Sequence, residues 1–165
     1  SGIMIDTNNF MSKTGVRTFE AAAFLRRNGA DVTRVRKLFR EDANDYKAKA
    51  DTVSQAEIYR NAFAISTCTS VDIQSPTVVG AQAANELLNI NGVKASFVLT
   101  EYQNEIFVSA RSIDEVNVQV IMEKMGGGGH LGTAGCQLQG ISLPEGIGIL
   151  KGNLDKMIEE GDLVI

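Results

Sequence analysis

Gly126-Gly127-Gly128-Gly129-His130 is the stretch around which the second part of this 165-residue chain is organised. Residues 118–125, just before it, carry apolar side chains at the spacing of a short helix with one buried face. One glycine would end that helix in a left-handed cap, and each further glycine costs about 0.5–1 kcal/mol of ordering entropy relative to alanine. Four glycines in a row are more than a cap needs, which indicates that this stretch requires backbone without side chains. Such backbone predicts an anion nest, in which main-chain amides hold a phosphate. A flexible loop with a surface histidine is the alternative.

Polar side chains on either side are expected to join the glycines around a phosphate. His130 is the only histidine of the chain, so it would donate at the edge of the nest and cannot belong to a cluster of several histidines. Arg111 ends a predicted strand, where its guanidinium could clamp a phosphate through two parallel hydrogen bonds. Ser109 shares a face with Arg111, because strand residues two apart point the same way. A surface salt bridge from Arg111 to Asp114 or Glu115 is the alternative.

From residue 60 onward the sequence alternates between strand and helix patterns. Apolar runs and turn residues predict strands at 62–68, 93–100, 105–111 and 135–142, and helices at 77–88, 116–125 and 144–160. Residues 101–104 predict a hairpin turn among crossover connections. The expected fold class is therefore α/β, a mixed sheet with flanking helices. Asn117, at the start of helix 116–125, could reach the same phosphate or simply cap the helix.

Charge divides the chain into two parts. Residues 1–40 carry a net charge of +5 and residues 41–165 carry −9, which gives −4 overall. A chain of this charge is not expected to bind a long nucleic acid, since surfaces that do so are basic. Residues 42–59 contain neither glycine nor proline and predict a connecting helix. The expected organisation is an N-terminal part over residues 1–41, this helix, and a second domain over residues 60–165.

The N-terminal part begins with a brief apolar run at residues 3–5, which is typical of the end of a buried strand. Asp6 would stand at the tip of that strand, where ligands and metals bind in open α/β sheets. An Asx-turn or a helix cap is the commoner use of Asp in such a position. Helices are predicted at 19–27, capped by Thr18, and at 32–40. Their basic residues could face phosphate, form a solvated face or pack on a neighbouring acidic surface.

Two further features concern the cellular compartment. Cys68 and Cys136 each lie in an apolar strand candidate, and without a signal peptide they are expected to be reduced and buried. No stretch approaches the roughly 18–20 apolar residues of a membrane span. Because the chain opens with Ser1 rather than Met, we expect an excised piece of a longer protein, lying on the cytoplasmic side.

Four motifs together carry a resemblance to the DHH-associated domain of the DHH phosphoesterase superfamily. They are Phe97-Val98-Leu99, the strand 106–112 ending in Ser109-Ala110-Arg111-Ser112, Asn117-Val118-Gln119-Val120-Ile121-Met122-Glu123, and the glycine stretch itself. The resemblance covers residues 60–158. Residues 1–40 resemble the end of the DHH catalytic domain, with Asp6 in its last metal-binding motif. The chain is most similar to the cyclic-di-AMP phosphodiesterases of Gram-positive bacteria, whose longer members are membrane-anchored.

This resemblance implies hydrolysis of cyclic-di-AMP to linear pApA with two manganese ions, of which Asp6 would be one ligand. It assigns the substrate-binding side to Ser109, Arg111, Gly126, Gly127, Gly128, Gly129 and His130. The family's other metal ligands, including its Asp-His-His, are missing from this sequence. We therefore expect this chain alone to bind no catalytic metal tightly and to be inactive. Its expected partners are a cyclic dinucleotide or short oligonucleotide, an upstream DHH domain, and a second copy in a homodimer.

Two other functions remain open at this point. One is an oligoribonuclease of the same superfamily that also takes pAp. The other is a non-catalytic nucleotide- or RNA-binding module, like the related domain of alanyl-tRNA synthetase. The acidic second part favours small nucleotides over long strands, because affinity for long strands depends on many basic contacts.

Overall fold

The computed structural model describes residue 33 and residues 43–69, 73–113 and 116–165. The chain divides into two compact units, Ser1–Glu41 and Asp42–Ile165. Apart from residue 33, every described residue belongs to the second unit. Asp6, the first predicted N-terminal helix, the basic run and, apart from residue 33, the predicted helix 32–40 lie outside the described residues.

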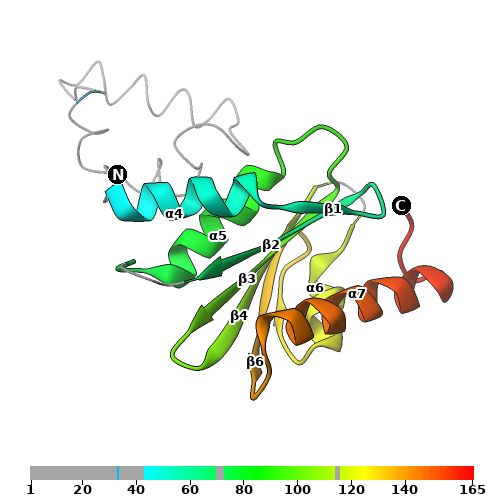
Figure 1. The fold of residues 1–165 in the computed structure, drawn as a ribbon. Helices are drawn as coiled ribbons and strands as arrows, with labels where there is room; N and C mark the ends of the chain where they lie inside the picture. The colour runs from blue at the N-terminus through cyan, green and yellow to red at the C-terminus, as the bar shows by residue number, and fades with distance from the viewer. Residues whose placement is uncertain (1–32, 34–42, 70–72, 114–115) are drawn as a thin grey trace, which may run out of the picture. The chain divides into compact units, whose positions relative to one another are not determined.

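The second unit is built on a mixed sheet with the strand order β1-β2-β3-β4-β6-β5 (Figure 1). The strands are β1 (Glu57–Tyr59), β2 (Phe63–Thr69), β3 (Ala95–Tyr102), β4 (Glu105–Ser112), β5 (Gly128–Gly129) and β6 (Thr133–Gln139). Only β2 and β3 run parallel among these neighbours, and the other pairs are antiparallel. The predicted α/β class with a mixed sheet and flanking helices is therefore confirmed.

Helices cover both faces of this sheet. On one face lie α4 (Ala43–Ser54) and α5 (Pro76–Leu87), and on the other lie α6 (Val118–Lys124) and α7 (Leu143–Glu159) (Figure 1). Strand β3 serves both layers, because Val98 packs toward α5 while its neighbours Phe97 and Leu99 belong to the core under α6 and α7. A strand buried on both faces reads as a continuous apolar run, which is why residues 93–100 were recognisable.

The described helices cover only part of the α5 face of the sheet. Helix α5 packs on β2, β3 and β4. Strand β4 alternates between fully buried residues under α6 and α7 and half-buried residues on the α5 side. Beyond α5, Gln137 and Gln139 of β6 are exposed on that side. Within the second unit, the described residues therefore leave the surface over β4, β6 and β5 partly uncovered.

Strand β1 corrects the prediction that residues 42–59 form one helix. Helix α4 ends at Ser54, and Glu57–Tyr59 turns back to pair with β2. Arg60 and Asn61 both adopt positive φ, at 51° and 58°, so they form the tight turn that closes this hairpin. The sequence pattern did not predict β1, because an edge strand of three residues is too short to show the two-residue period of a strand.

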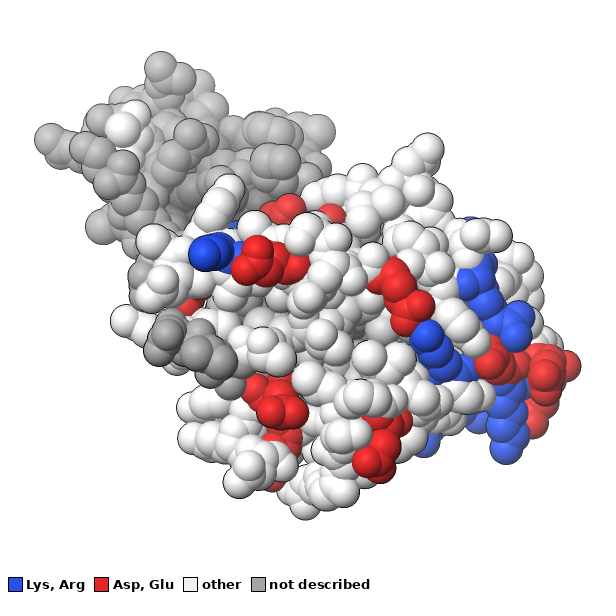
Figure 2. Space-filling view, viewed as in Figure 1, with Lys and Arg blue, Asp and Glu red and all other residues white. Residues whose placement is uncertain are grey.

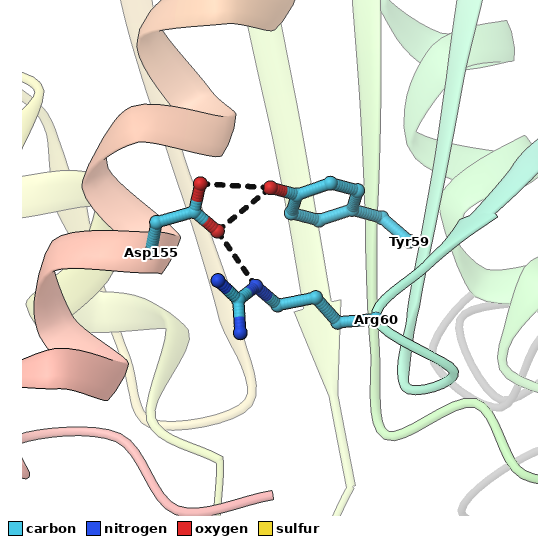
Figure 3. A network of polar contacts seen from close by, with 3 residues as sticks. All are labelled: Tyr59, Arg60 and Asp155. Atoms are coloured by element: carbon cyan, nitrogen blue, oxygen red, sulfur yellow. Dashed lines mark hydrogen bonds and ion pairs between the residues drawn. The ribbon is translucent and has the colours of Figure 1, made fainter.

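A polar network attaches this hairpin to the last helix (Figure 3). The Tyr59 hydroxyl donates to both carboxylate oxygens of Asp155, at 2.7 and 2.8 Å, and Arg60 Nε donates to Oδ1 at 2.7 Å. The Tyr59 hydroxyl, and after it the Arg60 guanidinium, holds the pKa of the Asp155 carboxyl below its usual value. Lys151 adds an ion pair with Glu57 at 2.7 Å. These contacts fix β1, one edge of the sheet, to α7.

Candidate functional site

The first two glycines of the stretch end helix α6 in a capping motif. Gly126 has a φ of +86°, and its amide donates to Glu123 O at 3.1 Å. The Gly127 amide reaches back to Met122 O at 2.8 Å, which is the pattern of a Schellman motif. The His130 amide donates to Thr133 O at 2.7 Å. The predicted nest of bare amides is therefore wrong for Gly126 and Gly127, whose N–H groups are used within the fold, as is the N–H group of His130.

The remaining glycines are constrained by the approach of β6, with one exception. A Cβ on Gly127 would lie 2.5 Å from Cys136 Cβ, and one on Gly129 would lie 2.5 Å from Ala134 Cα. A Cβ on Gly128 would meet no heavy atom within 4 Å, and its φ is not positive. Gly128 is thus the glycine of the stretch for which neither dihedral angles nor packing require the absence of a side chain.

The hairpin of β5 and β6 brings His130 into line with Arg111. His130 and Thr133 exchange two backbone hydrogen bonds, at 2.7 and 3.4 Å. Thr133 is in turn the partner of Arg111 in the pairing of β6 with β4. Residues directly opposite one another in antiparallel strands have their side chains on the same face. Arg111, Thr133 and His130 therefore form one transverse row, on the α5 side of the sheet, and we call it the cationic row after the guanidinium of Arg111.

Arg111 is a half-buried cation without a carboxylate partner among the described residues. One guanidinium nitrogen, Nη1, donates to Ala110 O at 2.8 Å. Burial lowers the pKa of Arg111, although an arginine stays charged in a protein. The alternative partners Asp114 and Glu115 lie outside the described residues. Within the described part of the chain, most of the donors of this guanidinium remain for an external acceptor, and an anion is the acceptor that suits them.

A bare strip of sheet borders the cationic row. Ser109 pairs with Gly135, and Gly135 pairs with Gly128, so one serine and two glycines cross three strands. By the same register they face the α5 side. An open hollow of about 580 Å³ lies over this strip, and its lining includes Ser109, Gly126, Gly127 and Gly135. Arg111 and His130 do not line the hollow itself but stand one row beyond it.

Asn117 caps helix α6, which is the alternative role predicted for it. Its side-chain oxygen accepts from the amides of Gln119 and Val120, at 3.0 and 3.4 Å, and caps α6. The amide of Val118, the first residue of α6, donates to Leu131 O at 3.1 Å, so the start of α6 lies against the loop after His130. A direct role of Asn117 in binding stays a prediction, and the cationic row is complete without it.

The described residues do not fit a metal centre. Among residue 33 and residues 43–69, 73–113 and 116–165, no three His, Cys, Asp or Glu side chains converge to hold an ion. Asp6, the metal ligand predicted from sequence, lies outside these ranges, so the described part of the chain supplies no ligand set for manganese. In the same ranges, no helix combines the length and the apolar character needed to cross a bilayer.

Thr133 is the member of the cationic row that the sequence did not reveal. Its place depends on the register between β4 and β6, and these strands are separated in the sequence by a helix and a hairpin. A pattern of alternate residues identifies the face of one strand but not its partner on the next. Gln137, which also lines the hollow, was missed for the same reason. Phe107 could have been found, because the two-residue period of β4 places it on the face of Ser109 and Arg111.

Comparison with known proteins supplies a family. A family model described as "DHHA1 domain" matches residues 63–161. The chain is 45% identical over 146 residues to the cyclic-di-AMP phosphodiesterase PdeA of Listeria monocytogenes, covering 88% of this chain and 22% of that protein. It is 40% identical over 163 residues to the cyclic-di-AMP phosphodiesterase GdpP of Bacillus subtilis, covering 98% and 25% respectively. The chain thus spans about a quarter of the length of these relatives.

The solved structures include a neighbour with the same fold. An exopolyphosphatase-related protein from Bacteroides fragilis superposes with a TM-score of 0.77 at 21% identity. The match covers 94% of this chain and 48% of the other. At this identity the likeness concerns the fold alone.

Proposed function

Because this chain belongs to the DHHA1 domain family, we propose that it is the substrate-binding part of a phosphodiesterase. The phosphate of a dinucleotide would bind at the cationic row, beside the bare strip of β4, β6 and β5. The relatives from Listeria and Bacillus are named for cyclic-di-AMP, and we propose the same substrate for the whole protein. The product would be linear pApA.

The observation that carries this proposal is the alignment of Arg111, Thr133 and His130 in one row. A guanidinium, a hydroxyl and an imidazole together offer several donors to phosphate oxygens. The donors stand next to a strip without large side chains, so an anion could approach the sheet closely. Gly128 has no packing reason to lack a side chain, and a ligand lying over it would supply one.

The chemistry of hydrolysis is proposed to depend on residues outside the described ranges. The sequence contains one histidine and no Asp-His-His, and the described residues hold no metal-binding cluster. We propose that two manganese ions are bound in the whole protein, with Asp6 as one ligand. The 165-residue chain is then expected to bind the dinucleotide without hydrolysing it.

The charge on the face seen in Figure 2 favours a small ligand over a long strand. In Figure 2, lysines and arginines gather at the side of the molecule where α7 lies, next to acidic residues. The rest of that face carries mostly acidic and uncharged residues. A groove for a long nucleic acid needs a continuous basic track to contact many phosphates. The face seen in Figure 2 has no such track among its described residues.

The proposal is tested by calorimetric titration of the chain with cyclic-di-AMP, pApA and a tRNA acceptor stem. Cyclic-di-AMP is expected to bind most tightly, and Arg111→Ala should weaken its binding at least tenfold, since the charge-assisted bonds to phosphate are lost. Arg60→Ala is the matched control, because it removes the same charge from the opposite edge of the sheet. Equal effects of the two substitutions, or preferred binding of the acceptor stem, would overturn the proposal.

A further inference from the structure

We propose that Phe107 and Gln137 form a subsite for a purine base, with adenine preferred over guanine. This inference extends the proposed function and rests on it, since it places the base beside the phosphate row. Phe107 and Gln137 are partners in the pairing of β4 with β6. They line the hollow of about 580 Å³ on the far side of the bare strip from Arg111.

The register fixes the order of these groups along the sheet. Three successive pairs on one face are Arg111 with Thr133, Ser109 with Gly135, and Phe107 with Gln137. Rows on one face repeat every two residues, which is about 7 Å along a strand. A phosphate held at the first row therefore leaves the flat middle row for a sugar and brings the attached base toward the third.

The middle row is flat because the sheet requires it. A Cβ on Gly135 would lie 2.7 Å from Val108 O, so no side chain fits there without displacing β4. Gly128, the next residue across, presents only backbone to the same surface. The floor between the cationic row and Phe107 is thus preformed by packing, and a planar ligand meets no side chain of β5 or β6 on it.

The lining of the hollow has the chemistry of a base and not of a phosphate. Its described lining carries no lysine, arginine, aspartate or glutamate and includes an aromatic ring, Phe107, and two side-chain amides, Gln137 and Gln139. Phe107 is half-buried, and its ring packs against Tyr102 at 6.4 Å between centroids. An aromatic ring held in place on a sheet is a platform on which bases stack.

The two glutamines at the hollow differ in what they are free to do. Gln139 donates to Glu105 Oε1 at 2.7 Å and is committed to that contact. Gln137 is exposed, and none of the described residues hydrogen-bonds its side-chain amide. A glutamine amide can both donate and accept, which matches the N7 acceptor and N6 donor of adenine. Guanine presents two acceptors at the same edge, so it would satisfy only the donor.

The stacking step is tested on the full 165-residue chain with cyclic-di-AMP and with an analogue containing 2-aminopurine, whose fluorescence falls when it stacks. Phe107→Ala is expected to weaken binding about tenfold or more and to abolish the quenching. Phe107→Leu keeps an apolar side chain and should preserve the fold, yet it should also lose the quenching. Ribose 5-phosphate, which has no base, should bind these variants and the unchanged chain equally.

The base preference is tested with Gln137→Ala, and Gln139→Ala is its matched control. Titration with cyclic-di-AMP and cyclic-di-GMP should show a preference for the adenine ligand that falls about tenfold in Gln137→Ala and stays unchanged in Gln139→Ala. If Arg111→Ala weakens binding while the Phe107 and Gln137 variants bind and discriminate normally, the base subsite is wrong and the phosphate site stands. If Arg111→Ala has no effect, both are wrong.

Discussion

Two neighbouring glycines, Gly127 and Gly128, should respond in opposite ways to the same substitution. In Gly127→Ala the new Cβ would lie 2.5 Å from Cys136 Cβ and 2.7 Å from Cys136 Cα, where the contacts are too short for any rotation to relieve. Overpacking of this kind destabilises a protein by about 1–3 kcal/mol, and contact with a backbone atom places Gly127→Ala near the upper end. In Gly128→Ala the Cβ meets nothing within 4 Å. There the loss of unfolded-state entropy should stabilise the chain by up to about 1 kcal/mol.

Urea unfolding of the two variants, followed by circular dichroism, measures this difference. We expect Gly127→Ala to be less stable than Gly128→Ala by about 2–4 kcal/mol. In a thermal scan this difference corresponds to roughly 5–15 °C for a chain of this size. Equal stabilities, or a lower stability of Gly128→Ala, would show that β5 does not lie against β6 as described. Gly128→Ala should nevertheless weaken binding of cyclic-di-AMP, because its methyl group would project onto the surface proposed to receive the ligand.

Three further predictions concern stability and reactivity away from the cationic row. The Tyr59 hydroxyl makes the largest contribution to lowering the pKa of Asp155 in the folded chain. The ionised carboxylate therefore stabilises the fold at pH values above its ordinary pKa of 3.8, and this stabilisation is lost as the pH falls through the lower pKa of the folded state. The stability difference between the unchanged chain and Asp155→Asn should therefore shrink between pH 6 and pH 3 in urea titrations, and a constant difference would contradict the network. Burial raises the pKa of the Cys136 thiol to about 11. A thiol reagent at pH 8 should therefore label Cys136 slowly in the folded chain and rapidly in denaturant, and equal labelling rates would refute the burial of Cys136. Gly80→Ala would press its Cβ against the buried hydroxyl of Thr100, which has no hydrogen-bond partner among the described residues, and should destabilise the chain by about 1–3 kcal/mol. The same substitution in a Thr100→Ala background should be nearly neutral, and additive effects in this double-mutant cycle would exclude the contact.

Local sequence patterns identified most elements of the described unit. Pro76 opens α5 as predicted, because its fixed φ suits the first turn of a helix. The turn predicted at residues 101–104 joins β3 to β4 but is shorter than predicted. Gln103 and Asn104, both at positive φ, form it, while Glu101 and Tyr102 still belong to β3. The strands and helices on either side have propensities that agree with their burial. In such segments the local pattern is sufficient, because tertiary packing does not oppose it.

The candidate site was only partly predictable, for a physical reason. The shared face of Ser109 and Arg111 follows from the two-residue period of a single strand. The alignment of His130 with Arg111 depends on two strand registers, which the sequence of neither strand determines. The glycines were expected to present bare amides, but capping of α6 and close packing on β6 use most of the stretch. A run of glycines can reflect either anion binding by bare amides or capping and close packing, and the sequence does not separate these two explanations until the partner strand is known.

Chemical-shift perturbation is the most direct test that the cationic row holds phosphate. The 165-residue chain, labelled with ¹⁵N, would be titrated with cyclic-di-AMP while backbone amides and the side-chain nitrogens of Arg111 and His130 are monitored. We expect the largest shifts at Arg111 Nε, Thr133, Gly128 and His130, and little change on the opposite face under α6 and α7. Shifts confined to the α6 and α7 face, or a side-chain Nε of Arg111 that does not respond at saturation, would contradict the placement of the phosphate.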